Sequence, residues 1–255
     1  MPASRRPAVA SGPMAAPVDD QQIPPYREHL GPRSQYLRDI ILGVNDGLVS
    51  MFLLVVGVVG GGVSSNVVLL AGLSGAFAGA VSMAAGEYMA TKSQEEAIDG
   101  ELELEREHFK YYKERELDEV RDYLGNIGVT GDAVEAVVAS AAADENVLME
   151  LMKAFEFGVI DDGRRNPIFA MVMSGLLFLA GSIPSVMPFV FMDNPDQALI
   201  VAAVGAAIGL FVVGVVKTQM TRTNPLKSGL ENVAVAGVGA IVSYFIGLGY
   251  DSFVS

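Results

Sequence analysis

The sequence contains no cysteine and no tryptophan. The absence of thiols excludes disulfide bonds and thiolate metal sites. Positive charge is also scarce, because 17 Lys and Arg stand against 30 Asp and Glu and the net charge is −13. This balance argues against nucleic acid as a partner. The acidic residues concentrate between about residues 95 and 162, so we expect a cationic partner for that region.

Apolar residues are abundant, since they make up 51% of the 255 residues. The mean hydropathy of +0.39 is too high for an ordinary soluble domain. Five apolar segments are long enough to cross a bilayer, which takes about 20 residues per span. They cover about residues 40–62, 67–91, 168–191, 198–216 and 229–250. The sequence therefore predicts an all-α polytopic membrane protein with five transmembrane helices.

The polar segments divide the chain into four predicted parts. These are a disordered N-terminal tail (1–36), transmembrane helices one and two (37–91), a polar helical insert (92–166) and transmembrane helices three to five (167–255). The tail shows no apolar run of the kind that follows the arginines of a secretory signal. In span three, Pro167 fits the first turn, and Pro184 and Pro188 are expected to kink or end the far half.

Lysine and arginine flank the spans unevenly, which predicts their orientation. Basic residues occur before span one, in the insert, and between spans four and five, whereas the turn after span one and the loop after span three carry none. The N-terminus and the insert are therefore expected in the cytoplasm and the C-terminus outside. Because no vacuolar sorting signal is evident, a prokaryotic plasma membrane is favoured over a vacuolar membrane.

Ionisable residues interrupt the first two spans. At 1.5 Å per residue, Asp46 lies about 9 Å from the start of span one, and Met83 and Glu87 lie about 12 and 6 Å from the end of span two. Acids in a membrane cost roughly 2.5–3.5 kcal/mol each and usually face a pathway or a partner. Two hard oxygen ligands and one soft sulfur favour a divalent transition metal over calcium or magnesium. Glu231, early in span five, lies at a similar depth.

Other roles for the two membrane acids stay open. Asp46 can serve helix packing or pair with Arg38, and Glu87 can reach the membrane interface or pair with Lys92. What favours a metal pathway is that the deep acids, a methionine beside them and an acidic insert all fall on one predicted side of the membrane.

The insert begins with strong helix formers from Glu101 to Glu119, without proline or glycine. At 100° per residue, a single helix would place six residues within about 80° of one another, namely Glu101, Glu105, His108, Tyr112, Glu116 and Glu119. Whether this run forms one helix or two, Glu105 and His108 are spaced i, i+3, as are Glu116 and Glu119. These spacings place the two members of each pair next to each other on one face of a helix.

Residues 125–131 are expected to break the helix, and a second helix follows from Asp132. A third starts near Asp144, a good N-cap, and places Met149, Met152 and Glu156 on one side. The alternative for the insert is a solvated helical bundle, in which i, i+4 pairs with the basic residues neutralise the acids and the methionines only pack. The basic residues in question are Arg106, Lys110, Lys113 and Arg115.

Three motifs resemble the vacuolar iron transporter family of iron and manganese carriers. They are RDIILGVNDGLV at residues 38–49, VSMAAGEY at 81–88 and TKSQ at 91–94, and the resemblance extends over about residues 37–250. It implies a five-span homodimer with a cytoplasmic metal-binding domain between spans two and three. It also implies movement of ferrous iron out of the cytosol in exchange for protons.

The resemblance implies roles for individual residues as well. Asp46 and Met83 match ion-pathway residues of the family. Its cytoplasmic carboxylate ligands are matched by Glu105, Glu116, Glu119 and Glu156, with Met152 or Met149 beside them. His108 stands where a glutamate is usual, and because imidazole also binds iron, a change in metal preference or pH dependence is expected.

The sequence thus predicts a non-enzymatic secondary transporter for Fe²⁺, with Mn²⁺ as a second candidate ion. The transported ion takes the place of a cofactor, protons are the counter-ion, and a second copy and membrane lipid are the other partners. Glu87 is a candidate for ion relay or proton coupling, since burial raises carboxyl pKa values. Two alternatives remain: a membrane-tethered metal buffer or sensor, and a structural membrane protein with a solvated acidic domain.

Overall fold

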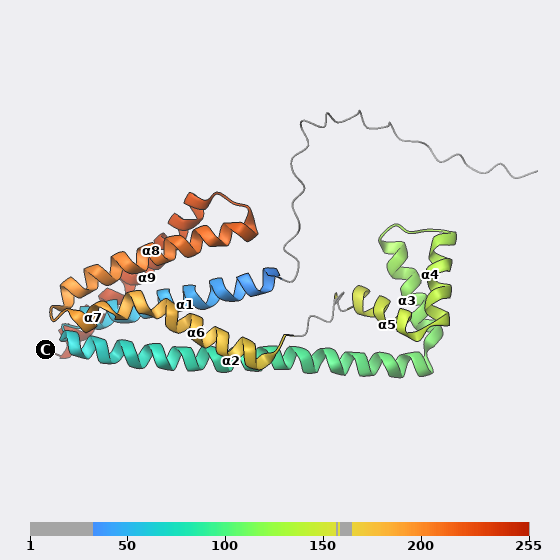
Figure 1. Cartoon of the computed structure of the whole chain (residues 1–255), viewed down its shortest axis with the longest axis horizontal. Helices are drawn as coiled ribbons and strands as arrows, with labels where there is room; N and C mark the ends of the chain where they lie inside the picture. Colours follow the sequence, from blue (N-terminus) through green and yellow to red (C-terminus); the bar gives the residue numbers. More distant parts are fainter. Residues whose placement is uncertain (1–32, 157, 159–164, 255) are drawn as a thin grey trace, which may run out of the picture. The chain divides into compact units, whose positions relative to one another are not determined.

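The computed structural model describes residues 33–156, 158 and 165–254, which form nine α-helices and no strand (Figure 1). The helices are α1 (Arg33–Gly60), α2 (Ser65–Tyr111), α3 (Lys113–Asn126), α4 (Asp132–Ala143), α5 (Glu145–Phe155), α6 (Pro167–Val186), α7 (Pro188–Phe191), α8 (Pro195–Thr221) and α9 (Pro225–Val254). Most of the predicted disordered tail lies outside the described residues, although α1 already begins at Arg33.

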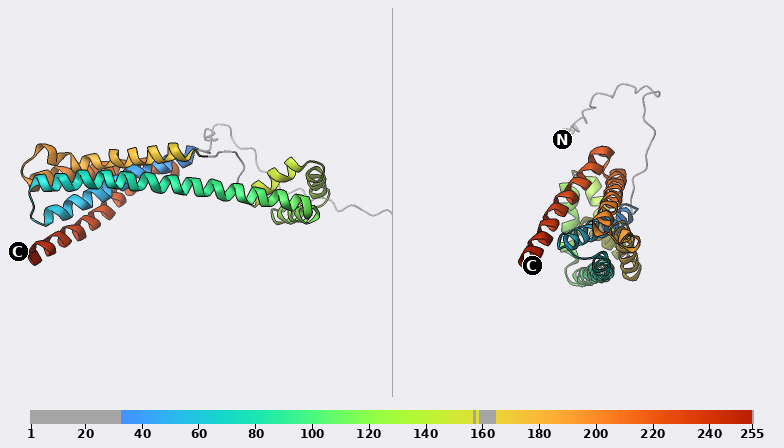
Figure 2. Two further views of the ribbon diagram at one scale, coloured as in Figure 1. Left: turned by 90° about the horizontal axis from the view of Figure 1, so that it is seen from below. Right: turned by 90° about the vertical axis from the view of Figure 1, so that its left-hand side faces the viewer.

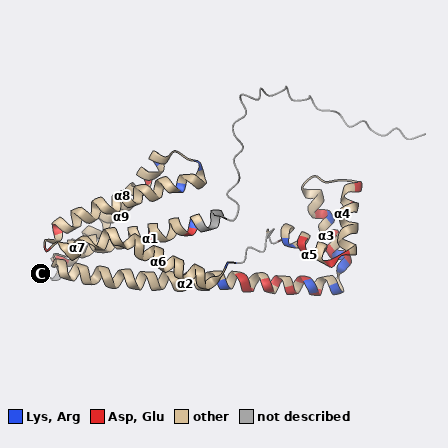
Figure 3. Ribbon diagram, viewed as in Figure 1, with Lys and Arg blue, Asp and Glu red and all other residues tan. Residues whose placement is uncertain are grey.

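Five of these helices, α1, α2, α6, α8 and α9, are long and apolar enough to cross a membrane. Figure 3 shows charged residues near the ends of these helices and over the second half of α2, with long uncharged stretches between them. This confirms the prediction of an all-α polytopic membrane protein with five spans.

Helix α1 contacts all four other membrane helices. Small residues allow the closest approaches, because a Cβ atom on Gly47 would collide with the Phe178 carbonyl and one on Gly181 with the Val44 carbonyl. Helix α9 packs chiefly against α1 and α8 and crosses the bundle obliquely (Figure 2). Its most apolar 18-residue window is only 11% buried, so most of α9 faces outward in a single chain.

Two polar side chains of α9 donate hydrogen bonds to neighbouring membrane helices. Asn232 on α9 donates to Asn45 Oδ1 at 2.8 Å and to the Leu210 carbonyl at 2.9 Å. Ser243 donates to the Leu53 carbonyl at 2.6 Å. Because unbonded polar groups are costly away from water, these bonds fix α9 against α1 and α8.

Three membrane helices begin with the same Asn-Pro pair. Asn166, Asn194 and Asn224 each accept hydrogen bonds from the backbone N–H groups two and three residues further on. The proline that follows each asparagine occupies the first turn, where no backbone donor is needed. In α6 this confirms the predicted position of Pro167. Helix α6 ends at Val186, before Pro188, as predicted for that proline, whereas Pro184 lies inside the helix.

Helix α2 differs from the prediction, because it does not end at Thr91. It continues for 47 residues to Tyr111, so the predicted boundary between span two and the insert lies inside one helix (Figure 1). The change from apolar to polar residues at Lys92 marks a change of environment only. The helix formers that follow keep the same backbone conformation.

The insert consists of the end of α2 and helices α3, α4 and α5. Its apolar core is formed by Phe109, Leu117, Val120, Leu124, Val138, Ala141, Leu148 and Met152. The predicted break between α3 and α4 is confirmed, with positive φ angles of 91° at Gly128 and 70° at Gly131. Asp144 caps α5 as predicted, because its side chain accepts from the Asn146 N–H at 2.8 Å.

A second break separates α2 from α3 at Tyr112, where φ is −133° and ψ is 27°. The run from Glu101 to Glu119 is therefore two helices, and the six residues of the single-helix alternative do not share one continuous face. Glu105 and His108 lie on α2, whereas Glu116 and Glu119 lie on α3.

Candidate metal sites in the insert and the membrane

Glu105, His108 and Glu116 converge where α2 meets α3. One ligand atom from each lies within 4.8 Å of the other two. The break at Tyr112 brings them together, because the Tyr112 carbonyl accepts from the Arg115 and Glu116 N–H groups and starts α3 in a new direction. His108 Nδ1 lies 3.2 Å from Glu116 Oε1.

The two carboxyl groups of this cluster are held away from water. Glu105 is 4% exposed and Glu116 is 2% exposed, and Oε2 of each has no hydrogen-bond partner. A buried carboxylate oxygen without a partner is costly, so this pair fits a proton or a cation. One imidazole nitrogen and several carboxylate oxygens form a ligand set typical of divalent transition metals.

Burial also changes the acidity of these groups. It raises the pKa of Glu105 to about 8, helped by a hydrogen bond with Glu156 and by the negative charges of Glu116, Glu156 and Glu119. The pKa of Glu116 is raised as well, chiefly by burial and then by Glu119, while His108 and Arg115 oppose the rise. Near neutral pH the carboxyl of Glu105 therefore holds a proton that a metal ion would have to displace.

The other predicted carboxylates lie at the edge of this cluster. Glu156, the residue after α5, shares a side-chain hydrogen bond with Glu105. Glu119 forms an ion pair with Arg115 at 3.3 Å. Arg106 pairs with the exposed Glu103 at 2.9 Å rather than with the cluster. Of these two arginines, only Arg115 pairs with one of the predicted ligands.

The predicted methionine ligands contribute to the apolar core of the insert. Met152 is fully buried in that core, and Met149 is half-buried against it. The Met152 carbonyl accepts from the Glu156 N–H at 2.8 Å, which places the sulfur-bearing residue one helical turn before a cluster carboxylate. A ligand role for either sulfur stays a prediction.

In the membrane helices, Asp46 and Met83 have different surroundings. Asp46 is exposed on α1 in a single chain. Met83 on α2 is half-buried against the cluster formed by Met51, Ala76, Ala80, Phe178 and Val186. Glu231 is exposed near the start of α9.

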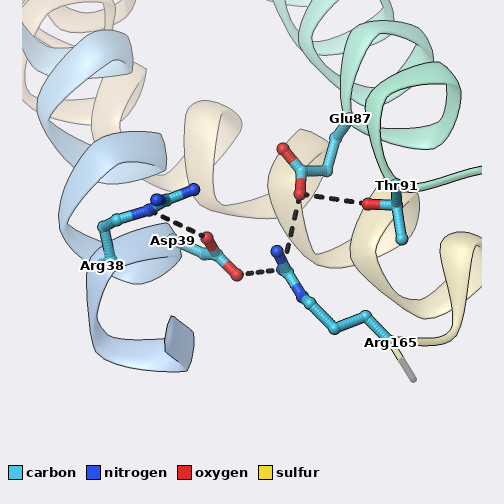
Figure 4. A network of polar contacts seen from close by, with 5 residues as sticks. All are labelled: Arg38, Asp39, Glu87, Thr91 and Arg165. Atoms are coloured by element: carbon cyan, nitrogen blue, oxygen red, sulfur yellow. Dashed lines mark hydrogen bonds and ion pairs between the residues drawn. The ribbon is translucent and has the colours of Figure 1, made fainter. Parts of the chain in front are cut away.

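Glu87 belongs to an ion-pair network that the sequence did not indicate (Figure 4). Its Oε1 lies 3.4 Å from Arg165 Nη2 and accepts a hydrogen bond from Thr91, and the same Arg165 nitrogen pairs with Asp39 on α1. Lys92, the partner that the sequence suggested for Glu87, pairs instead with Glu96 at 3.6 Å. Asp39 and Arg165 are 126 positions apart, so no local pattern could have joined them.

Arg38, the alternative partner predicted for Asp46, is near Asp39 instead. Its Nε is 3.9 Å from Asp39 Oδ1, and its side chain is 74% exposed. This leaves Asp46 as an exposed acid on a helix that otherwise has the composition of a membrane span.

The chain combines five membrane-type helices with an acidic helical insert that holds buried carboxyl groups. These features place it in the class of polytopic helical membrane proteins. The model of the VIT family matches residues 37–248. The chain therefore belongs to the VIT family, in agreement with the resemblance of the three motifs.

Named relatives align over most of the chain. Vacuolar iron transporter 1 of Arabidopsis thaliana is 30% identical over 209 residues, which is 82% of each chain. Vacuolar iron transporter 1 of Tulipa gesneriana is 27% identical over 228 residues, covering 89% of this chain and 92% of that one. Protein CCC1 of Saccharomyces cerevisiae is 24% identical over 219 residues, covering 82% of this chain and 67% of that one.

Proposed function

We propose that this protein transports divalent transition-metal ions, with Fe²⁺ as the main ion and Mn²⁺ as the second. The observation that carries the proposal is the cluster of Glu105, His108 and Glu116, with ligand atoms within 4.8 Å and two unpartnered carboxylate oxygens. Membership of the VIT family and the names of relatives such as vacuolar iron transporter 1 support the same conclusion.

The ion moves out of the cytosol in this proposal. The basic residues before α1 and between α8 and α9 favour a cytoplasmic insert. The cluster collects the ion there, and the continuous helix α2 leads from the cluster to Met83 and Glu87 in the membrane. Asp46 and Met83 then replace part of the water shell of the ion.

A second copy of the chain completes the pathway. Asp46 is exposed in one chain, and a charged carboxylate facing lipid costs roughly 2.5–3.5 kcal/mol. A homodimer that covers this face of α1 removes the cost and places two Asp46 side chains along one pathway.

Protons are the proposed counter-ion. A carboxyl group that must lose its proton before it binds metal couples the two ions without any covalent step. Glu87 is the proposed proton relay, because it is the first charged residue of α2 after the apolar stretch that begins at Ser65.

A second candidate is a membrane-tethered metal buffer or sensor. The ion pair between Glu87 and Arg165 favours it, because a paired carboxylate also serves to hold helices together. In this alternative the insert binds metal and the membrane helices only anchor it.

Flux of Fe²⁺ into proteoliposomes with a luminal pH probe separates the two candidates. We expect the wild type to take up Fe²⁺ while the lumen loses protons, and Asp46→Asn to lose most of this flux. The matched control is Asp193→Asn, which removes an exposed acid in the loop before α8 and leaves flux unchanged. Metal binding without flux in the wild type would favour the buffer.

A further inference from the structure

One guanidinium nitrogen joins the first turns of α1 to the middle of the long helix α2. Arg165 Nη2 contacts Oδ2 of Asp39 on α1 and lies 3.4 Å from Oε1 of Glu87 on α2 (Figure 4). All three side chains are about one-fifth exposed, at 20%, 20% and 23%. One nitrogen of a positively charged guanidinium, between carboxylate oxygens of two helices, occupies the place that a bridging metal ion would take.

The charges at this point do not balance. Two carboxylates face one guanidinium, and the next cation, Arg38, is 3.9 Å from Asp39 on a side chain that is 74% exposed. A charge pair with such an exposed partner contributes little, because water screens it. The network therefore keeps a net charge close to −1. A divalent ion in place of Arg165 would balance the charges of both carboxylates.

Replacement also has a structural basis. Arg165 is joined to the network only through its flexible side chain, since the backbone at this position precedes α6 and its Asn166 cap. The guanidinium can swing away by rotation about side-chain bonds while α6 stays in place. Carboxylates accept either an arginine or a metal ion at the same oxygens, but not both at full strength.

We propose that Arg165 is a resident cation that competes with the transported divalent ion for Glu87 and Asp39. Arg165 thereby lowers the affinity of this end of the membrane path, so that an ion arriving there is released rather than trapped. This inference rests on the proposed function for its role in transport, although the competition itself is a property of binding alone.

The test measures binding and transport on the same variants of the full-length protein. Binding of Mn²⁺ in lipid nanodiscs is followed by the loss of the electron paramagnetic resonance signal of the free aqueous ion. Transport is the KM and kcat for Mn²⁺ uptake into proteoliposomes. The variants are Arg165→Gln, Arg165→Lys and Arg165→Gln combined with Glu87→Gln, and the matched control is Arg38→Gln.

We expect Arg165→Gln to tighten binding at one Mn²⁺ site by roughly three- to tenfold, a range set by partial solvent screening of the pair. KM for uptake should fall by a similar factor, and kcat should fall because release is slower. Arg165→Lys keeps the charge and gives an intermediate shift. The added Glu87→Gln change should abolish the tighter binding, and Arg38→Gln should match the wild type.

A role for Arg165 in helix packing alone gives a different pattern. Arg165→Gln would then lower kcat and thermal stability with unchanged Mn²⁺ affinity and unchanged KM, and that result overturns the proposal. If Arg165→Gln does not fold, the Mn²⁺ affinity of Arg165→Lys tests the proposal instead. An Mn²⁺ affinity of Arg165→Lys equal to that of the wild type also overturns the proposal. Tighter, Glu87-dependent binding without uptake in any variant would support the competition and reject transport.

Discussion

Glu105 and Glu116 are carboxyl groups that the insert holds out of water next to one histidine. Their burial has an energetic consequence, because a raised pKa means that the folded state binds protons more tightly than the unfolded state. For Glu105 the ordinary value of 4.5 rises to about 8. The stabilisation is complete below pH 4.5 and is lost as the pH rises through about 8.

We therefore expect the metal-free insert to become less stable between pH 5 and pH 8.5. Hydrogen-exchange mass spectrometry of peptides spanning the α2–α3 junction measures this, with protection factors corrected for the intrinsic exchange rate. Glu105→Gln should remove the part of the pH dependence near pH 8, because a neutral amide has no proton to lose, and should leave the part due to Glu116. Glu107→Gln, an exposed neighbour on the same helix, should keep it. Protection that stays constant over this range in the wild type would contradict the assignment.

Met152 offers a direct comparison of packing with metal binding. Its side chain is fully buried in the insert core, so the structure favours a packing role. Met152→Leu nearly conserves volume and should cost less than about 1.5 kcal/mol of stability. We expect Mn²⁺ affinity to change less than about twofold, whereas Glu116→Gln should weaken it by roughly ten- to hundredfold, the range for lost charge-assisted contacts.

Isothermal titration calorimetry on the purified full-length protein provides both affinities. A large loss of affinity in Met152→Leu, with unchanged thermal stability, would instead assign the thioether as a ligand. The sequence named Met149 and Met152 as candidates because they share a face with Glu156. Which of these residues points into the core depends on how α5 packs on α3 and α4, and the sequence does not specify that packing.

At the scale of the helices, close packing of α1 against α6 depends on glycine. A Cβ atom at position 181 would meet the carbonyl of Val44, which is backbone and cannot move without shifting α1. We expect Gly181→Ala to reduce stability by about 1–3 kcal/mol, the usual cost of overpacking. Gly249→Ala, where nothing lies within 4 Å, should be neutral or slightly stabilising.

The measurement is the temperature at which half of the detergent-purified protein is lost from the size-exclusion peak. Equal midpoints for the two alanine variants would show that α1 and α6 are not held at this distance. The same comparison tests the helix arrangement independently of any transport activity.

Helix α2 shows that the sequence pattern predicts a helix more reliably than the position where the helix ends. Its apolar half and its acidic half were each predicted as helical, because both contain strong helix formers. The prediction placed a boundary at residue 91 because hydropathy changes there, but hydropathy reports the surroundings of a helix rather than its backbone. The real break lies at Tyr112, inside a run with no proline or glycine.

At the scale of the whole molecule, the exposed Asp46 predicts a partner chain. Leu42 lies one helical turn before Asp46 on α1 and is 53% exposed. Since the natural chain has no cysteine, Leu42→Cys introduces a single thiol. We expect a short bifunctional maleimide to convert this variant in membranes to a covalent dimer. Ile208→Cys on α8, at 61% exposure, should stay mostly monomeric.

Light scattering coupled to size-exclusion chromatography supplies the uncrosslinked mass. A monomer in mild detergent together with no crosslinking of Leu42→Cys would contradict the proposed homodimer. In that case Asp46 would need a different explanation, such as a thinned or hydrated lipid boundary around α1.

The sequence by itself determined the five spans, the start of α6 at Pro167 and the resemblance to the family, because span length, capping and motifs are local properties of the chain. Only the tertiary structure decided which groups meet. It turned Glu116 back toward Glu105 and His108 by a break at Tyr112, and it paired Glu87 with Arg165 rather than with Lys92. Contacts between distant residues follow from the packing of whole helices, which no local spacing specifies.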